Sequence, residues 1–175
     1  VVKGVKLFNE SGATQIVAIG GGSAMDVAKC IKLFSNMNPN TNYLEQKVIP
    51  NDIKLLAIPT TAGTGSEATR YAVIYYNGSK QSISDFSCIP TDVVYDPSML
   101  ISLSVYQKKA TMLDALSHAV ESMWSVNSND KSKKFSREAI KLIIKNKEAY
   151  ISGDSSVFLE MFRASYLAGR AINIT

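Results

Sequence analysis

An aspartate and the only histidine of the chain stand four residues apart, at Asp114 and His118, in a mostly apolar run. In a helix this spacing places both side chains on one face. A carboxylate and an imidazole placed in this way can ligate a divalent cation such as Fe²⁺ or Zn²⁺. The same pair can instead form a hydrogen bond within the helix, or the histidine can be satisfied in the core. Two ligands alone do not make a tight site, since a catalytic metal usually has three or four protein ligands. Glu121, one turn further on, is a weaker candidate ligand.

A run of three glycines, Gly20, Gly21 and Gly22, joins an expected strand directly to an expected helix. Glycine allows a backbone to approach a ligand closely. The free N–H groups and partial positive charge at a helix N-terminus suit a phosphate. Ser23 and Asp26 have the spacing of a capping pair. The run therefore fits either a pyrophosphate-binding loop or an ordinary tight turn.

A second polar loop, PTTAGTGSE at residues 59–67, also follows an expected strand. It carries the hydroxyl groups of Thr60, Thr61, Thr64 and Ser66 and has little apolar surface to pack. Ligands of open α/β sheets bind at the carboxyl ends of the strands, so we expect both loops to face one crevice. A solvent-exposed polar loop is the competing interpretation.

The elements that position these residues follow from the apolar pattern. Residues 1–103 alternate short apolar runs with glycine-rich turns, which predicts an α/β layer with a mainly parallel sheet. We expect buried strands at 15–19 and 54–58, a helix after the first of them, a hairpin joining 72–76 to 82–84 through Asn77-Gly78, and a strand at 92–95. Residues 104–175 are expected to begin an all-helical domain, with amphipathic helices at 106–124, 130–150 and 156–173.

Composition excludes several classes of protein. The 175 residues are 46% hydrophobic and carry a net charge of +4, so the chain can bury a core. No apolar run approaches the roughly 20 residues of a membrane helix, and the first residues lack a secretory pattern. We therefore expect a cytoplasmic protein that binds no membrane, with Cys30 and Cys88 as reduced thiols.

The basic residues between 131 and 147 are expected to form the solvated face of a helix. Its opposite face would carry Phe135, Ile140, Ile143 and Ile144. No aromatic platform accompanies these charges, and we expect no nucleic-acid binding.

The motifs GGGSAMDVAK, PTTAGTGSE and DALSHAVES occur in this order, and together they resemble the iron-containing alcohol dehydrogenase family over essentially the whole chain. The resemblance implies a Rossmann-like nucleotide-binding α/β domain followed by an all-α domain, the dehydroquinate synthase-like architecture, with the active site between them. Residues 121–132 and 164–175 are most similar to the branch of phosphonoacetaldehyde reductases and related small-aldehyde reductases. The resemblance further implies that these residues are the middle of a longer, homodimeric enzyme, with both domains incomplete.

The resemblance also assigns roles to matching positions. The cofactor, NAD or NADP, would have its pyrophosphate at Gly21, Gly22 and Ser23, with Asp26 supporting that loop. Its adenosine and nicotinamide portions would lie along Thr60, Thr61 and Thr64, with Lys80 near the nicotinamide ribose. Asp114 and His118 match the first two of four metal ligands, for Fe²⁺ or alternatively Zn²⁺, and would act in catalysis through the metal. The two later histidines of the family are absent from these residues.

The implied reaction is hydride transfer between NAD(P)H and a small aldehyde or primary alcohol, with the metal polarising the carbonyl group. Two other interpretations stand beside it. One is a related enzyme of the glycerol dehydrogenase or dehydroquinate synthase type, which PTTAGTGSE disfavours. The other is an inactive truncated chain that lacks half of its metal ligands.

Overall fold

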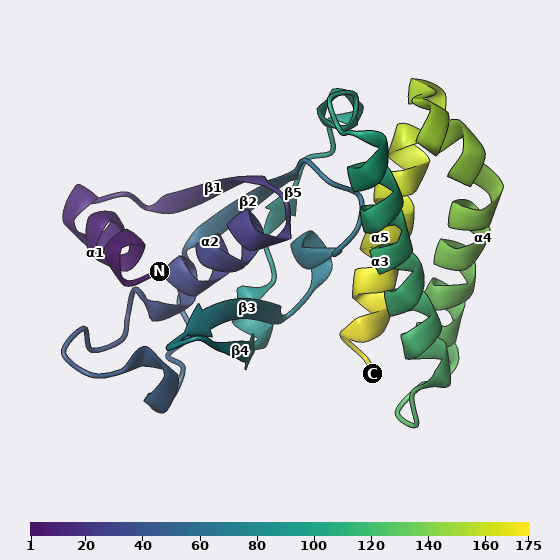
Figure 1. Ribbon diagram of the computed structural model, residues 1–175. Coiled ribbons are helices and arrows are strands. Elements are labelled where there is room, and N and C mark those ends of the chain that lie inside the picture. The colour runs from purple at the N-terminus through teal and green to yellow at the C-terminus, as the bar shows by residue number, and fades with distance from the viewer.

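The computed structural model describes residues 1–175. They form an α/β layer and, beside it, a layer of three long helices (Figure 1). The strands are β1 (Gln15–Gly20), β2 (Lys54–Pro59), β3 (Tyr71–Tyr76), β4 (Ser79–Ser84) and β5 (Asp92–Val93). The helices are α1 (Val2–Ser11), α2 (Gly22–Phe34), α3 (Val105–Trp124), α4 (Asp130–Ser152) and α5 (Phe158–Ile172). The predicted α/β layer followed by a helical region is confirmed, whereas α1 lies in a stretch for which no element was predicted.

The sheet is parallel, with strand order β1-β2-β5. In its register Gly20 pairs with Pro59, so β1 and β2 end at the same level and their following loops start side by side. Helix α2 packs on one face of β1 through Ala18. On the opposite face Val17 is 53% and Ile19 is 59% exposed. The prediction that β1 is buried is therefore wrong, because only one face of the strand is covered.

Strands β3 and β4 form the predicted hairpin as a separate two-stranded sheet. Its turn residues, Asn77 at φ 49° and Gly78 at φ 76°, both have the left-handed backbone that suits a two-residue hairpin turn. The hairpin packs against α2, the helix that follows the first polar loop.

The three long helices start and end within a few residues of their predicted positions, because capping residues mark their ends. Ser104 forms a capping box with Gln107 at the start of α3, and Asn129 forms one with Ser132 at the start of α4. Gly153, at φ 91°, ends α4. The basic face of α4 is largely exposed, as expected. Ile144, expected on the apolar face, is 51% exposed instead.

None of these helices combines the length and the apolar composition needed to cross a membrane.

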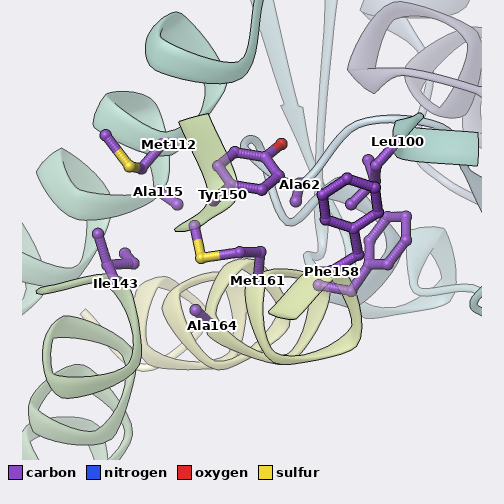
Figure 2. Close-up of a cluster of buried hydrophobic side chains, with 10 residues drawn as sticks. Ala62, Leu100, Met112, Ala115, Ile143, Tyr150, Phe158, Met161 and Ala164 are labelled. Atoms are coloured by element: carbon purple, nitrogen blue, oxygen red, sulfur yellow. The ribbon is translucent and has the colours of Figure 1, made fainter. Parts of the chain in front are cut away.

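The main hydrophobic cluster lies within the helical layer and reaches one of the polar loops. Figure 2 shows Ala62 of the 59–67 loop together with side chains from the three long helices. The buried members are Ala62, Leu100, Met112, Ala115, Ile143, Tyr150, Phe158, Met161, Phe162 and Ala164. The loop is therefore anchored in the helical core, and the helical layer helps to set its conformation.

Candidate active site

The two glycine-containing loops pack against each other at the carboxyl ends of β1 and β2. The N–H of Thr60 donates to the carbonyl oxygen of Gly20 at 2.9 Å. A Cβ atom built on Gly22 would lie 2.7 Å from Cγ2 of Thr64, and one on Gly21 would lie 3.3 Å from Oγ1 of Thr61. The 59–67 loop is mostly buried, so its interpretation as a solvent-exposed loop is wrong.

Helix α2 begins without a side-chain cap. Gly21 is the N-cap residue, and its carbonyl oxygen accepts from the N–H groups of residues 24 and 25. The N–H groups of Gly22 and Ser23 therefore have no partner within the helix and are available to an anion. The Ser23 side chain is exposed.

Asp26 does not pair with Ser23, and the predicted capping pair is wrong. Its Oδ1 accepts from the Ser66 hydroxyl at 2.7 Å, and its Oδ2 accepts from the N–H of Val73 at 3.1 Å. The Ser66 hydroxyl belongs to the second loop and the Val73 N–H to the hairpin. Both donors are partly buried, and each therefore needs a hydrogen-bond partner. Asp26 thus supports the loops by joining three elements, rather than by capping its own helix.

Lys29, which sequence reasoning missed, lies fully buried one turn after Asp26. Its Nζ donates to Ser66 Oγ at 2.9 Å, to the carbonyl oxygen and Oγ1 of Thr69 at 2.9 and 3.0 Å, and to the carbonyl oxygen of Tyr71 at 2.7 Å. Burial lowers the pKa of Lys29 to about 8, and the Asp26 carboxylate opposes this shift. The only signal in the sequence is the Asp-x-x-Lys spacing, which places both residues on one helical face.

Glu67, the last residue of the second loop, is also buried. Its Oε1 accepts from the hydroxyl of Tyr95 at 3.2 Å. Burial raises the pKa of Glu67 above its usual range, and the Tyr95 hydrogen bond opposes this. The loop therefore ends in a polar contact inside the protein.

The second loop meets α5 through backbone atoms. Gly65 has a φ of 60°, and a Cβ atom on it would lie 2.5 Å from the carbonyl oxygen of Ser165. A Cβ atom on Gly169 would lie 2.6 Å from the carbonyl oxygen of Gly65. Beside this contact, Asn173 accepts from the N–H of Arg70 at 2.8 Å and donates to the carbonyl oxygen of residue 68 at 2.6 Å. The α/β layer and the helical layer therefore meet at a contact that only glycine allows.

Asp114 and His118 lie on α3, with Oδ1 of the aspartate 3.6 Å from Nε2 of the histidine. This distance is too long for a hydrogen bond. It matches two donors that share one ion through bonds of about 2.1 Å each. Nδ1 of His118 is buried and has no hydrogen-bond partner. The chain places no group of three or more His, Cys, Asp or Glu side chains suited to a metal, so the pair fits half of a metal site and Glu121 does not complete it.

A crevice of about 240 Å³ joins these features. Its lining residues come from α2, the second loop, the hairpin, α3 and α5: Asp26, Thr64, Ser66, Thr69, Tyr71, Val73, Ser82, His118 and Ile172. Sequence analysis missed five of these residues, because hydroxyl and apolar side chains outside a motif carry no signal in one sequence: Thr69, Tyr71, Val73, Ser82 and Ile172. Lys80 is exposed on β4 and lies two residues before Ser82, hence on the same face of the hairpin.

A larger groove of about 720 Å³ lies between β5 and the helices α4 and α5, and none of the predicted site residues lines it. The crevice at His118 is therefore the candidate active site, because predicted site residues line it.

The fold and this crevice define a class: an α/β layer of the nucleotide-binding kind joined to a helical layer across a shared cleft. Residues 1–97 match the family model described as iron-containing alcohol dehydrogenase, and residues 108–175 match the C-terminal model of the Fe-containing alcohol dehydrogenase family. The chain belongs to the iron-containing alcohol dehydrogenase family.

Similar proteins cover the chain almost completely. It is 36% identical to aldehyde-alcohol dehydrogenase 2 of Entamoeba histolytica over 98% of the chain and 21% of that protein. It is 35% identical to the NAD-dependent methanol dehydrogenase of Bacillus methanolicus over 99% of the chain and 47% of that protein. The chain thus spans less than half the length of these curated relatives.

Two solved structures are also similar to this chain over almost its whole length. The sulfoacetaldehyde reductase of Bifidobacterium kashiwanohense in complex with NAD⁺ has a TM-score of 0.91 at 27% identity, over 99% of this chain and 48% of that one. The iron-containing alcohol dehydrogenase of Thermotoga maritima has a TM-score of 0.88 at 34% identity, with the same coverage. The assignment to the phosphonoacetaldehyde reductase branch stays a prediction.

Proposed function

We propose that the full-length protein transfers a hydride reversibly between NAD(H) and a small aldehyde or primary alcohol. The observation that carries this proposal is the crevice at which Thr64 of the second loop and Asp26 of α2 lie together with His118 of α3. Membership of the iron-containing alcohol dehydrogenase family supports it. So do the named activities of the relatives, which include a methanol dehydrogenase and an aldehyde-alcohol dehydrogenase.

The cofactor is proposed to lie across the two loops. The N–H groups of Gly22 and Ser23 would receive its pyrophosphate, because they face outward from the start of α2 without partners in the helix. The hydroxyls of Thr60, Thr61 and Thr64 would flank it, and Lys80 would reach the ribose from the hairpin. NAD is favoured because a structural relative is bound to NAD⁺ and a curated relative is described as NAD-dependent. NADP is the alternative, and a comparison of the affinities of the protein for NADH and NADPH decides between the two cofactors.

Asp114 and His118 would hold two positions of a divalent ion, which the family name indicates is iron, with zinc as the alternative. When bound, such an ion polarises a carbonyl oxygen as a Lewis acid. His118 lines the crevice that Thr64 and Asp26 also line, and Asp114 lies 3.6 Å from it, so α3 would place the substrate carbonyl beside the nicotinamide. The remaining ligands would come from outside these residues.

Turnover in both directions tests the proposed function. The full-length protein is expected to oxidise NADH when a small aldehyde is added and to reduce NAD⁺ when a primary alcohol is added. A glycerol dehydrogenase would use glycerol instead, and an enzyme of the dehydroquinate synthase type would show no net change in NADH. Either of these results would replace the proposed function.

Gly22→Val is expected to weaken NADH binding about tenfold or more, which corresponds to about 1.4 kcal/mol. The added Cβ would lie 2.7 Å from Cγ2 of Thr64, so the two loops would separate where the pyrophosphate is proposed to bind. A fluorescence titration with NADH measures the effect. Ala13→Val, on the exposed turn at the other end of β1, is the control and should bind NADH normally. An unchanged affinity in Gly22→Val would show that the glycine run is only a turn.

A further inference from the structure

Gly63 is the point at which the second loop touches the helix that carries Asp114 and His118. A Cβ atom built on Gly63 would lie 2.7 Å from Cβ of Thr111 and 2.9 Å from its carbonyl oxygen. Thr111 stands one turn before Asp114 on α3. We propose that Gly63 is a positioning residue that sets the distance between the nicotinamide and the Asp114–His118 pair. The inference rests on the proposed function, because it names what fixes the geometry of the hydride transfer.

The contact is made by atoms that cannot turn aside. The carbonyl oxygen of Thr111 belongs to the backbone of α3, and its hydroxyl donates to the carbonyl oxygen of Gln107 at 2.8 Å. Ala62, the residue before Gly63, is buried in the same hydrophobic cluster as Met112 of α3. The loop is therefore held against the helix, and the space between their backbones admits no side chain at position 63.

The next residue of the loop, Thr64, connects this contact to the proposed cofactor site. A Cβ atom on Gly22 would lie 2.7 Å from its methyl group, and its Oγ1 accepts from the N–H of Ser66 at 3.2 Å. Thr64 also lines the crevice together with His118. The loop therefore lies against α3 at Gly63 and against the start of α2 at Thr64, so it separates the proposed cofactor site from the proposed metal site.

A side chain at position 63 would push the α/β layer away from α3. Ordinary contact between carbon atoms begins at about 3.5 Å, so the loop would move by about 0.8 Å at its contact with Thr111. Because Thr64 already contacts the start of α2, the loop and α2 would move together. NADH would then still bind, but farther from α3. A misplacement of about 1 Å can lower the rate of an enzymatic step about 100-fold.

Gly63→Ala in the full-length protein is expected to lower kcat at saturating NADH and aldehyde about tenfold or more. The Kd for NADH and the bound metal should stay within about twofold, because both cofactor loops and the Asp114–His118 pair are unaltered. A readout independent of turnover is the paramagnetic relaxation that Mn²⁺, loaded in place of Fe²⁺, causes at the nicotinamide protons of bound NAD⁺. This relaxation falls steeply with distance, so it should be weaker in Gly63→Ala than in the wild type.

Gly4→Ala, on α1, is the matched control. Neither Gly4 nor Gly63 has a left-handed backbone, so alanine can adopt the conformation of both. The Cβ atom added at Gly4 would lie 2.6 Å from Cδ1 of Ile31, which is the end of a flexible side chain and can move aside. Gly4→Ala should leave the kcat, the Kd for NADH and the paramagnetic relaxation unchanged.

A purely structural role of Gly63 predicts a lower melting temperature with an unchanged kcat and unchanged relaxation, and this result would overturn the inference. Should Gly63→Ala fail to fold, Ala62→Gly provides the milder test, because it loosens the anchor of the loop in the helical core without adding an atom. We expect its kcat to fall about threefold at an unchanged Kd for NADH, and an unchanged kcat would overturn the inference. If the wild type itself transfers no hydride, the proposed function fails, and the inference fails with it.

Discussion

His118→Ala in the full-length protein is expected to lose its bound metal and its turnover together. His118 is the only histidine of the chain, and it faces Asp114 across the 3.6 Å gap proposed for the ion. Loss of an outer-shell partner already costs about 10–100-fold in metal affinity or activity, so we expect the loss of a ligand to cost at least about 100-fold. Metal analysis of the purified variant, together with an assay of NADH oxidation, measures both effects.

The control is Ser117→Ala, which changes an exposed neighbour on the same helix. It should retain full metal content and full turnover. Binding of NADH should be close to normal in His118→Ala, because the two cofactor loops are unaltered. Full metal content in His118→Ala would contradict the assignment of His118 as a ligand and would leave the Asp114–His118 pair as a structural contact.

Gly65→Ala is expected to lower the free energy of unfolding by about 3 kcal/mol. The left-handed backbone at φ 60° costs an alanine about 1–2 kcal/mol. Overpacking costs a further 1–3 kcal/mol or so, because the new Cβ would lie 2.5 Å from a backbone oxygen of Ser165 that has no freedom to rotate away. Because Gly65 belongs to the second loop, we also expect weaker NADH binding. Denaturant unfolding of the full-length protein measures the change in stability.

Gly12→Ala is the matched control for the backbone contribution. Gly12 also has a left-handed backbone, with φ 69°, but nothing lies within 4 Å of a Cβ atom built on it. It should lose only the conformational part, about 1–2 kcal/mol, and should bind NADH normally. Equal destabilisation of the two variants would show that the contact between the second loop and α5 does not constrain the protein.

Local signals made most of the elements predictable. Helices α3 and α4 begin at Ser and Asn caps, α4 ends at Gly153, and Asn77-Gly78 marks the hairpin turn. The two polar loops were predictable as neighbours because parallel strands end at one edge of a sheet. Gly20 pairs with Pro59 in the sheet, so the two loops start at the same level.

Long-range contacts account for what could not be predicted. Asp26 accepts a hydrogen bond from Ser66, which lies 40 residues away in the sequence. Lys29 is buried, although lysine side chains are almost always exposed. The close approach of Gly65 to Gly169 joins residues from the two layers, and no local pattern reveals it. The exposure of Val17 also escaped prediction, because an apolar strand does not show how many of its faces are covered.

The most direct test of the account is the rate at which the metal-free full-length protein oxidises NADH with a small aldehyde as Fe²⁺ is added. We expect almost no turnover without metal and a rise in rate that saturates at about one ion per chain, since Asp114 and His118 are proposed to supply two ligands of one site. A rate that is the same with and without a divalent metal would contradict the proposed role of this pair and, with it, the central claim.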